Sequence, residues 1–207
     1  MALIDISPPV DALIGVWPGD TPYVQRFNSE IKDGSNITLS EINTTVHVGA
    51  HTDAPSHYVA NGGDIASRRL DYYIGPCNVL HVAIERGRRI MPADLAGRRI
   101  SAPRVLLRTG TFPDHRNWNN DFASLSPELV DFLHKRGVIT IAIDTPSVDP
   151  FDSKELEAHH AFAENDMAII EGIVLDEVEE GEYELIALPL RLIGADASPV
   201  RAVLRRL

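Results

Sequence analysis

The 207-residue chain contains 44% hydrophobic and 24% charged residues, an ordinary globular balance in a chain long enough to bury one sizeable core. Its formal net charge of −11 argues against a nucleic-acid partner, because phosphates would be repelled. No apolar run can span a bilayer, and the N-terminus lacks the basic and apolar regions of an export signal. We therefore expect a single domain over residues 1–207 with no membrane partner.

The first part of the chain predicts short strands separated by turns. Residues 3–6 are predicted to form a strand that ends at Ser7-Pro8-Pro9. Two prolines and a glycine stiffen the loop that follows, Trp17-Pro18-Gly19-Asp20-Thr21-Pro22. The indole on this loop is either a lid on the core or a wall for a flat ligand, and composition favours the lid. Residues 23–31 and 37–46 are predicted to pair as a hairpin around Asp33-Gly34.

The second strand of this hairpin leads into a dense group of metal-binding residue types. His47, His51, Asp53 and His57 follow the spacing H-x-x-x-H-x-D-x-x-x-H. Alternate residues of an extended strand share a face, so the first three are expected to point into one cavity. Imidazole and carboxylate are the ligand set of a zinc-like ion. A solvated strand face is the alternative, but so many histidines of one parity favour a metal site.

The rest of the chain alternates strand and helix patterns. Strands are expected at residues 79–84, 104–108, 138–143, 167–170, 183–188 and 200–204, and helices at 92–95, 126–136 and 155–163. The apolar run 138–143 is typical of a strand buried on both faces of a partly parallel sheet. Roughly eight strands and three or four short helices indicate a mixed α/β domain.

Three residues outside the motif, one cysteine and two on an aromatic stretch, have simple structural interpretations. Cys77 is the single cysteine, so it cannot form an internal disulfide, and it is expected to be a small buried apolar residue. A lone reduced thiol fits a cytoplasmic protein. His115 and Trp118 lie in the polar and aromatic stretch 112–122, which is expected to be a long loop. Either could contact a substrate, but His115 is expected to be solvent-exposed.

The central motif resembles the signature of the metal-dependent cyclase-like hydrolases, H-x-G-T-H-x-D-x-P-x-H. The chain departs from it once, at Ala50, where threonine is usual. The Trp17–Pro22 loop, the segment 144–149, the His159-His160 pair and Glu171-Gly172 resemble the bacterial kynurenine formamidase (arylformamidase) branch. These similarities occur in the expected order over nearly the whole chain, and the central motif is the specific one.

The resemblance implies a fold and a site. The fold would be a compact swivelling β/β/α domain, usually a homodimer. The site would hold two zinc ions, for which Mn²⁺ or Co²⁺ could substitute. The implied metal ligands are His47, His51, Asp53, His159 and Glu171. Asp53 and Glu171 would bridge the two ions. His160 adjoins His159 and remains the alternative ligand, although the separation from Glu171 favours His159.

The resemblance also implies a reaction. His57 would be the acid/base and Trp17 would contact an aromatic substrate. The expected activity is hydrolysis of N-formyl-L-kynurenine to L-kynurenine and formate in tryptophan breakdown. A sibling hydrolase that opens a cyclic amide such as isatin is the alternative within enzymes. A metal-storing or metal-sensing protein is a third hypothesis, disfavoured by His57, which a closed metal site would not need.

Overall fold

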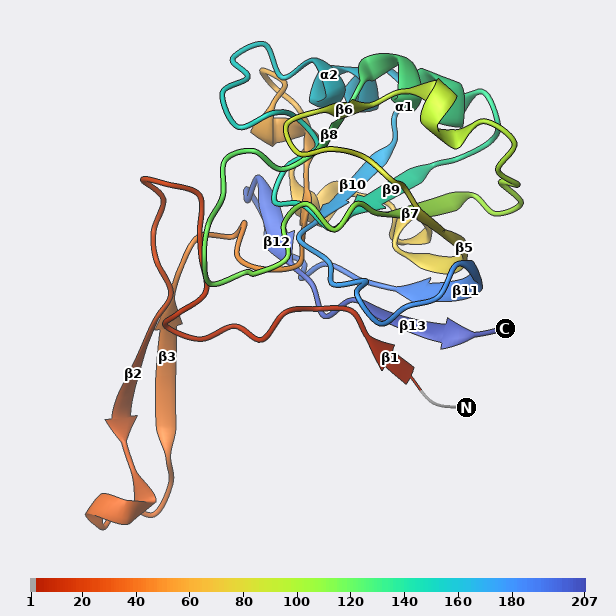
Figure 1. Ribbon diagram of the computed structural model, residues 1–207. Coiled ribbons are helices and arrows are strands. Elements are labelled where there is room, and N and C mark those ends of the chain that lie inside the picture. Colours follow the sequence, from red (N-terminus) through yellow and green to blue (C-terminus); the bar gives the residue numbers. More distant parts are fainter. Residues whose placement is uncertain (1–2) are drawn as a thin grey trace.

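A curled nine-stranded sheet with helices on one face forms the body of the protein (Figure 1). The computed structural model describes residues 3–207. The sheet has the strand order β1-β13-β11-β5-β7-β9-β10-β4-β12, and its four central strands run parallel. This arrangement confirms the expected mixed α/β fold class with a partly parallel sheet.

The strands are short, and two pairs lie outside the main sheet. Their bounds are β1 Leu3–Asp5, β2 Val24–Ser29, β3 Leu39–Asn43, β4 His51–Asp53, β5 Ile74–His81, β6 Arg89–Ile90, β7 Arg104–Arg108, β8 Ser124–Leu125, β9 Thr140–Ile143, β10 Ala168–Glu171, β11 Gly181–Ile186, β12 Ala197–Pro199 and β13 Val203–Arg206. The helices are α1 Pro127–His134 and α2 Glu157–Glu164, with 3-10 turns at Ile31–Asp33, Pro55–His57, Ile65–Ser67, Leu70–Tyr72 and Pro92–Leu95. Strands β2 and β3 pair only with each other, as do β6 and β8.

The central strands are buried on both faces, as the apolar run 138–143 predicts. In β9, Ile141 and Ile143 pack on the face covered by α1 and α2, whereas Ala142 packs on the opposite face. The alternation follows from the two-residue period of a strand. Leu133 and Phe162 come from the two helices and are fully buried against the first of these faces.

Helix α1 begins and ends as its sequence predicts. Ser126 caps it by accepting a hydrogen bond from the Leu129 N–H at 3.1 Å, and Pro127 takes the first position. Gly137 follows the helix with a φ of +83°, a conformation that glycine adopts without a Cβ clash. Neither α1 nor α2, the two helices within residues 3–207, has the length or hydrophobicity that a membrane crossing requires.

One predicted strand needs correction, and three observed strands have no prediction. The predicted strand 79–84 is shifted, because β5 begins at Ile74 and ends at His81. Strand β12 was not predicted, since three residues ending in Pro199 are too short to show a pattern. With β6 and β8 also unpredicted, residues 3–207 contain thirteen strands rather than about eight.

The predicted hairpin exists, but it is not part of the main sheet. Strands β2 and β3 form an arm that extends away from the body (Figure 1). The second hairpin strand ends at Asn43, and a turn separates it from β4. The interpretation of a single strand running from the hairpin through His47 to Asp53 is therefore wrong. Only His51 and Asp53 share the strand, because Gly49 turns the chain with a φ of +61°.

Candidate active site

Strand pairing brings three of the predicted ligands to one face of the sheet. In the antiparallel pair β4–β10, His51 lies opposite Glu171, and Asp53 lies two residues beyond His51. Residues that pair across a sheet, and residues two apart in a strand, share a face. That face is the one on which α2 packs, so α2 can add His159 to the same group.

The contacts at these three residues are short. His51 Nδ1 lies 2.9 Å from the Gly49 carbonyl oxygen, to which it can donate. Its other nitrogen, Nε2, lies 3.2 Å from Glu171 Oε2 and 3.6 Å from Asp53 Oδ1. The second Glu171 oxygen accepts a hydrogen bond from the Val148 N–H at 2.7 Å. The backbone thus holds His51 Nδ1 and one Glu171 oxygen. His51 Nε2 and the other Glu171 oxygen face the cluster.

Asp149 sets the orientation of His159. Its buried carboxylate accepts hydrogen bonds from the backbone N–H groups of Ala158 and His159 at 3.1 and 3.0 Å, at the start of α2. It also lies 2.8 Å from His159 Nδ1. This contact leaves His159 Nε2 facing Asp53 Oδ2 at 3.4 Å. A carboxylate behind a histidine in this way is typical of metal sites, where it fixes the ring and its tautomer. The neighbouring His160 is exposed to solvent.

His47 reaches the cluster from the turn before β4. Its Nδ1 lies 3.1 Å from Asp53 Oδ1. A close backbone approach holds this turn against the end of β10. Gly172 has a φ of +65°, and a Cβ at this position would lie 2.3 Å from the Gly49 carbonyl oxygen. Glycine at residue 172 is therefore required for the turn that carries His47 to lie beside Glu171.

The environment of Asp53 fits a bound cation. The residue is only 2% exposed, and neither carboxylate oxygen has a hydrogen-bond partner among residues 3–207. The ring nitrogens of His47 and His159 lie 3.1 and 3.4 Å from these oxygens, and burial makes the carboxylate charge costly unless a metal ion or protons on these histidines compensate it. His47, His51 and Asp53 present donor atoms within 4.8 Å of one another, as do Asp53, His57 and His159. The donor set, imidazole nitrogens and carboxylate oxygens, suits a zinc-like metal ion.

The pKa values of the clustered histidines reflect the negative charge of the carboxylates around them. Burial lowers the pKa of His47, but the carboxylates of Asp53 and Asp196 outweigh burial and raise it to about 9. Burial likewise opposes charge on His159, yet Asp149, Asp53 and Glu171 raise its pKa to about 10. Burial raises the pKa of Asp53, but the surrounding histidines hold it well below its usual range. Without a metal ion, the carboxylates would be neutralised by protons on the histidines.

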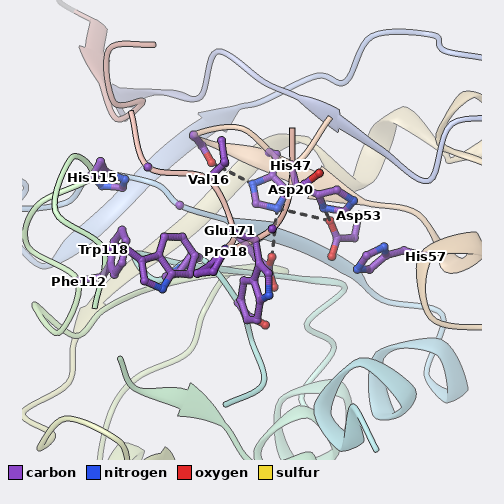
Figure 2. A pocket seen from close by; sticks show the side chains of 18 of the residues that line it. Val16, Pro18, Asp20, His47, Asp53, His57, Phe112, His115, Trp118 and Glu171 are labelled. Carbon is purple, nitrogen blue, oxygen red and sulfur yellow. Dashed lines mark hydrogen bonds and ion pairs between the residues drawn. The ribbon is translucent and has the colours of Figure 1, made fainter. Parts of the chain in front are cut away.

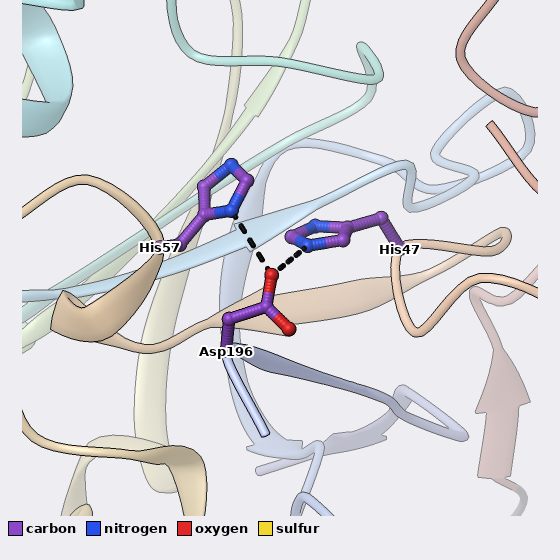
Figure 3. Close-up of side chains that lie close together, drawn as sticks. All are labelled: His47, His57 and Asp196. Atoms are coloured by element: carbon purple, nitrogen blue, oxygen red, sulfur yellow. Dashed lines mark hydrogen bonds and ion pairs between the residues drawn. The ribbon is translucent and has the colours of Figure 1, made fainter. Parts of the chain in front are cut away.

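Asp196 is a site residue that the sequence did not indicate. It precedes β12, and its Oδ2 lies 3.1 Å from His47 Nε2 and 3.2 Å from His57 Nδ1 (Figure 3). His57 itself is exposed and ends the 3-10 turn Pro55–His57. Nothing in the local sequence marks Asp196, because its role depends on the pairing of β12 with β4, which crosses most of the chain.

A cavity of about 490 Å³ opens over the cluster, and aromatic side chains form one of its walls. In Figure 2, His57 lies at one side, Asp53 and Glu171 in the middle, and His115, Trp118 and Phe112 at the other side. The wide space beside a compact polar cluster suits a substrate with a flat apolar part and one reactive polar group.

Trp17 lines this cavity, and its ring is held by other aromatic rings. It stacks on Phe151 with centroids 5.0 Å apart, and its centroid lies 5.4 Å from that of Trp118 in an edge-to-face arrangement. The loop of residues 112–122 is tied to the Trp17 loop by a hydrogen bond from the Gly15 N–H to the His115 carbonyl oxygen at 2.6 Å. The tryptophan is therefore a wall of the cavity, in place of the lid that composition favours.

The expected solvent exposure of His115 is wrong. Its side chain lines the cavity and is half-buried, with its ring 5.4 Å from that of Phe112. Burial lowers the pKa of His115, so the imidazole is neutral near pH 7. The contact with the Trp17 loop draws this part of the chain inward, an effect that a local sequence pattern does not reveal.

Comparison with known proteins defines the family. Residues 4–150 match the family described as Putative cyclase. The chain is 48% identical to the kynurenine formamidase of Bordetella pertussis and 46% identical to that of Bordetella petrii, each over 206 residues covering 99% of this chain and 98% of the relative. The chain belongs to the cyclase family. The full-length similarity to kynurenine formamidases confirms the resemblance found in the motifs and makes it an amidohydrolase.

Solved structures share the fold. A potential metal-dependent hydrolase with cyclase activity superposes with a TM-score of 0.84 at 25% identity, covering 98% of this chain and 96% of the other. A predicted metal-dependent hydrolase from Bacillus stearothermophilus has a TM-score of 0.83, also at 25% identity, with 98% and 97% covered. Isatin hydrolase A from Labrenzia aggregata has a TM-score of 0.83 at 22% identity, covering 98% and 93%, and so shows the fold alone.

Proposed function

We propose that the protein hydrolyses N-formyl-L-kynurenine to L-kynurenine and formate. The observation that carries this proposal is the full-length similarity to two kynurenine formamidases. The cavity supports it, since a cluster of histidines and carboxylates lies beside an aromatic wall that contains Trp17 and Trp118. The substrate has matching parts, a formylated amide to be cleaved and an aniline ring to be packed.

We propose two zinc ions as the cofactor, with Mn²⁺ or Co²⁺ as possible substitutes. The side chains that would hold them are His47, His51, Asp53, His159 and Glu171, the residues that surround the unpartnered Asp53 oxygens. When bound, such ions would polarise the formyl carbonyl and bring the pKa of water to about 7. Asp53 lies between His47 and His159, so it is the proposed shared ligand, with Glu171 as the second bridge.

The chain supplies the remaining requirements of amide hydrolysis. His57 lies beside the cluster and is exposed toward the cavity, where it would carry a proton to the leaving nitrogen. This transfer matters because a neutral aniline is a far better leaving group than an anilide anion. Trp17, fixed between Phe151 and Trp118, would hold the ring of the substrate with little ordering cost. Buried carboxylates such as Asp149 keep the histidine rings in place.

We further propose a homodimer that resides in the cytoplasm. Support for the dimer comes from the β2–β3 arm, whose apolar side chains are exposed on the single chain. Phe27 is 51% exposed and Ile42 is 64% exposed. The cytoplasmic location rests on Cys77, a buried free thiol suited to a reducing compartment.

Formate release from N-formyl-L-kynurenine, measured with and without a chelator, tests the proposed reaction. We expect turnover that is lost on chelation and restored by zinc. Isatin is the control for a sibling hydrolase, because it is also flat but opening its cyclic amide releases no formate. Faster turnover of isatin than of formylkynurenine at matched concentration would replace the formamidase assignment. Metal binding without turnover of either compound would favour a metal-storing or metal-sensing protein.

A further inference from the structure

Asp196 connects two histidines that approach the cavity from different elements. One carboxylate oxygen, Oδ2, lies within hydrogen-bond distance of both His57 Nδ1 and His47 Nε2, at 3.2 and 3.1 Å (Figure 3). Within residues 3–207, no other carboxylate oxygen lies within 4.0 Å of a His57 ring nitrogen. The nearby buried carboxylate Asp149 contacts His159 instead. His57 therefore depends on Asp196 for a charged partner.

Hydrogen bonds and strand pairing fix the backbone of Asp196 and of the residues before and after it. The Asp196 carbonyl oxygen accepts a hydrogen bond from the Ala54 N–H at 2.8 Å, directly after β4. The preceding residue, Ala195, accepts from Ile65 N–H at 3.0 Å, and the following residue, Ala197, pairs with Asp53 in the sheet. The same strand pair thus places Asp53 in the cluster and Asp196 beside it, so the spacing between the two carboxylates is set by the sheet.

The contact decides which nitrogen of His57 can react. A neutral imidazole has one N–H and one free nitrogen, and a carboxylate at Nδ1 favours the proton on that nitrogen. The lone pair is then on Nε2, the atom that can take a proton from the hydroxyl of the tetrahedral intermediate, which derives from the attacking water, and pass it to the leaving nitrogen. We propose that Asp196 is a positioning residue that holds His57 in this tautomer and orientation for proton transfer to the leaving aniline. The inference rests on the proposed function, because it assigns Asp196 a part in the same reaction.

A metal ligand is the competing role for Asp196. His47, His57 and Asp196 present donor atoms within 4.8 Å of one another, so the geometry would also admit an ion among them. The two roles differ in what the removal of the charge does. A ligand, when removed, releases metal and lowers every hydrolysis. A positioning residue, when removed, leaves metal in place and lowers only reactions that need a proton on the leaving group.

The experiment compares Asp196→Asn with the parent protein on two formyl compounds. N-formyl-L-kynurenine releases an aniline, which needs a proton, whereas phenyl formate releases a phenoxide, which is stable without one. We expect Asp196→Asn to lower kcat for formylkynurenine by roughly a hundredfold, the usual range for loss of general acid–base catalysis, with KM little changed. Both measurements use zinc in excess, because Asp196 also contacts the proposed ligand His47. Phenyl formate hydrolysis above the uncatalysed rate and the zinc content should then stay within about twofold of the parent values.

Two controls make the comparison specific. Asp64→Asn is the matched control, because the Asp64 carboxylate accepts from the backbone N–H of Gly194 at 2.7 Å in the same loop but contacts no histidine. It should leave both rates unchanged. The double variant Asp196→Asn with His57→Ala should be no slower than His57→Ala alone, because two residues that act through one step do not add.

Four results would overturn the inference. Three of them are an equal loss for both formyl compounds, a loss of zinc from Asp196→Asn even with zinc in excess, and a further slowing when Asp196→Asn is added to His57→Ala. A parent protein that is active on formylkynurenine, with an equally active Asp196→Asn, would also remove the inference while leaving the proposed function intact. A parent protein with no activity on formylkynurenine would instead overturn the proposed function.

Discussion

The Asp53 carboxylate is buried among His47, His51 and His159, where the proposed metal ions would compensate its charge. Asp53→Asn keeps the size of the side chain but removes the charge. Because Asp53 is the proposed shared ligand, we expect this variant to lose both metal ions and formamidase activity. Elemental analysis after repletion with zinc measures the metal content, and the parent protein should retain two ions per chain. One ion per chain in a fully active parent protein would remove the binuclear proposal.

His57 differs from the other histidines of the cluster because it is exposed, whereas His51 and His159 are buried. As a proton carrier it should affect rate more than metal content. We expect His57→Ala to lower kcat by roughly a hundredfold or more while the metals remain bound. Steady-state kinetics and metal analysis on one sample check both quantities. Loss of metal would make His57 a ligand, a role that its position near Asp53 and His159 also permits.

Trp17 forms part of the cavity wall, so its effect should depend on the substrate. Trp17→Ala removes a ring that stacks on Phe151, and we expect it to raise KM for formylkynurenine with a smaller change in kcat. Small aliphatic formamides have no ring to pack and should be poor substrates that are nearly indifferent to the change. Comparing the two KM values before and after substitution tests this assignment. An equal loss for both compounds would indicate general damage to the site.

The site residues that could be predicted from sequence are those that lie close together in the chain and belong to one motif. His47, His51, Asp53 and His57 fall within eleven positions, and the structure brings all four beside the same cavity. Asp149 and Asp196 could not be predicted in this way. Each is a single aspartate in a loop, and its contact depends on packing against α2 or on the pairing of β12 with β4.

The turn between β3 and β4 carries His47, so the arrangement of the site depends on where this turn lies. Gly172→Ala would place a Cβ 2.3 Å from the Gly49 carbonyl oxygen and would also force a residue with a side chain to a φ of +65°. The left-handed conformation costs about 1–2 kcal/mol and the clash about 1–3 kcal/mol more. At about 2–4 °C per kcal/mol for a chain of this size, we expect the melting temperature to fall by roughly 5–15 °C.

Gly110→Ala separates these two effects. Gly110 has the same φ of +65°, but a Cβ there would meet nothing within 4 Å. Its melting temperature should therefore fall only by the conformational part, about 2–8 °C. Gly172→Ala should also lose formamidase activity and metal, because the turn carries His47, whereas Gly110→Ala should retain both. Equal melting temperatures for the two variants would contradict the close approach of Gly172 to Gly49.

Helix and strand boundaries can be predicted where a capping residue or an apolar pattern lies within the element's own sequence. Helix α1 keeps the predicted start, with Ser126 as its cap, and β9 keeps the predicted burial. The hairpin 23–46 was predicted as well, but its separation from the main sheet was not. The alternation of polar and apolar residues in a strand does not determine which sheet the strand joins. Apolar residues on an exposed arm are favourable only where another surface covers them.

The β2–β3 arm exposes apolar side chains that a single chain leaves uncovered. Phe27 and Ile42 lie on one face of the arm, and Val24 and Leu39 lie on the other, as the pairing of Phe27 with Ser40 and of Val24 with Asn43 requires. An isolated two-stranded hairpin is marginally stable in water. Apolar side chains on both faces indicate that the arm is enclosed by a partner, and a second copy of the chain is the proposed partner.

Charge placed on the arm should therefore separate the two copies. We expect the parent protein to have twice the chain mass of 22.8 kDa by light scattering, and Phe27→Asp combined with Ile42→Asp to have the mass of one chain. Full burial of each side chain contributes about 1.5–3 kcal/mol, so the double change should weaken association by roughly a hundredfold or more. Leu207→Asp is the matched control, because Leu207 is 72% exposed and lies outside the arm. It should remain a dimer, and a double variant that also remained one would place the interface elsewhere.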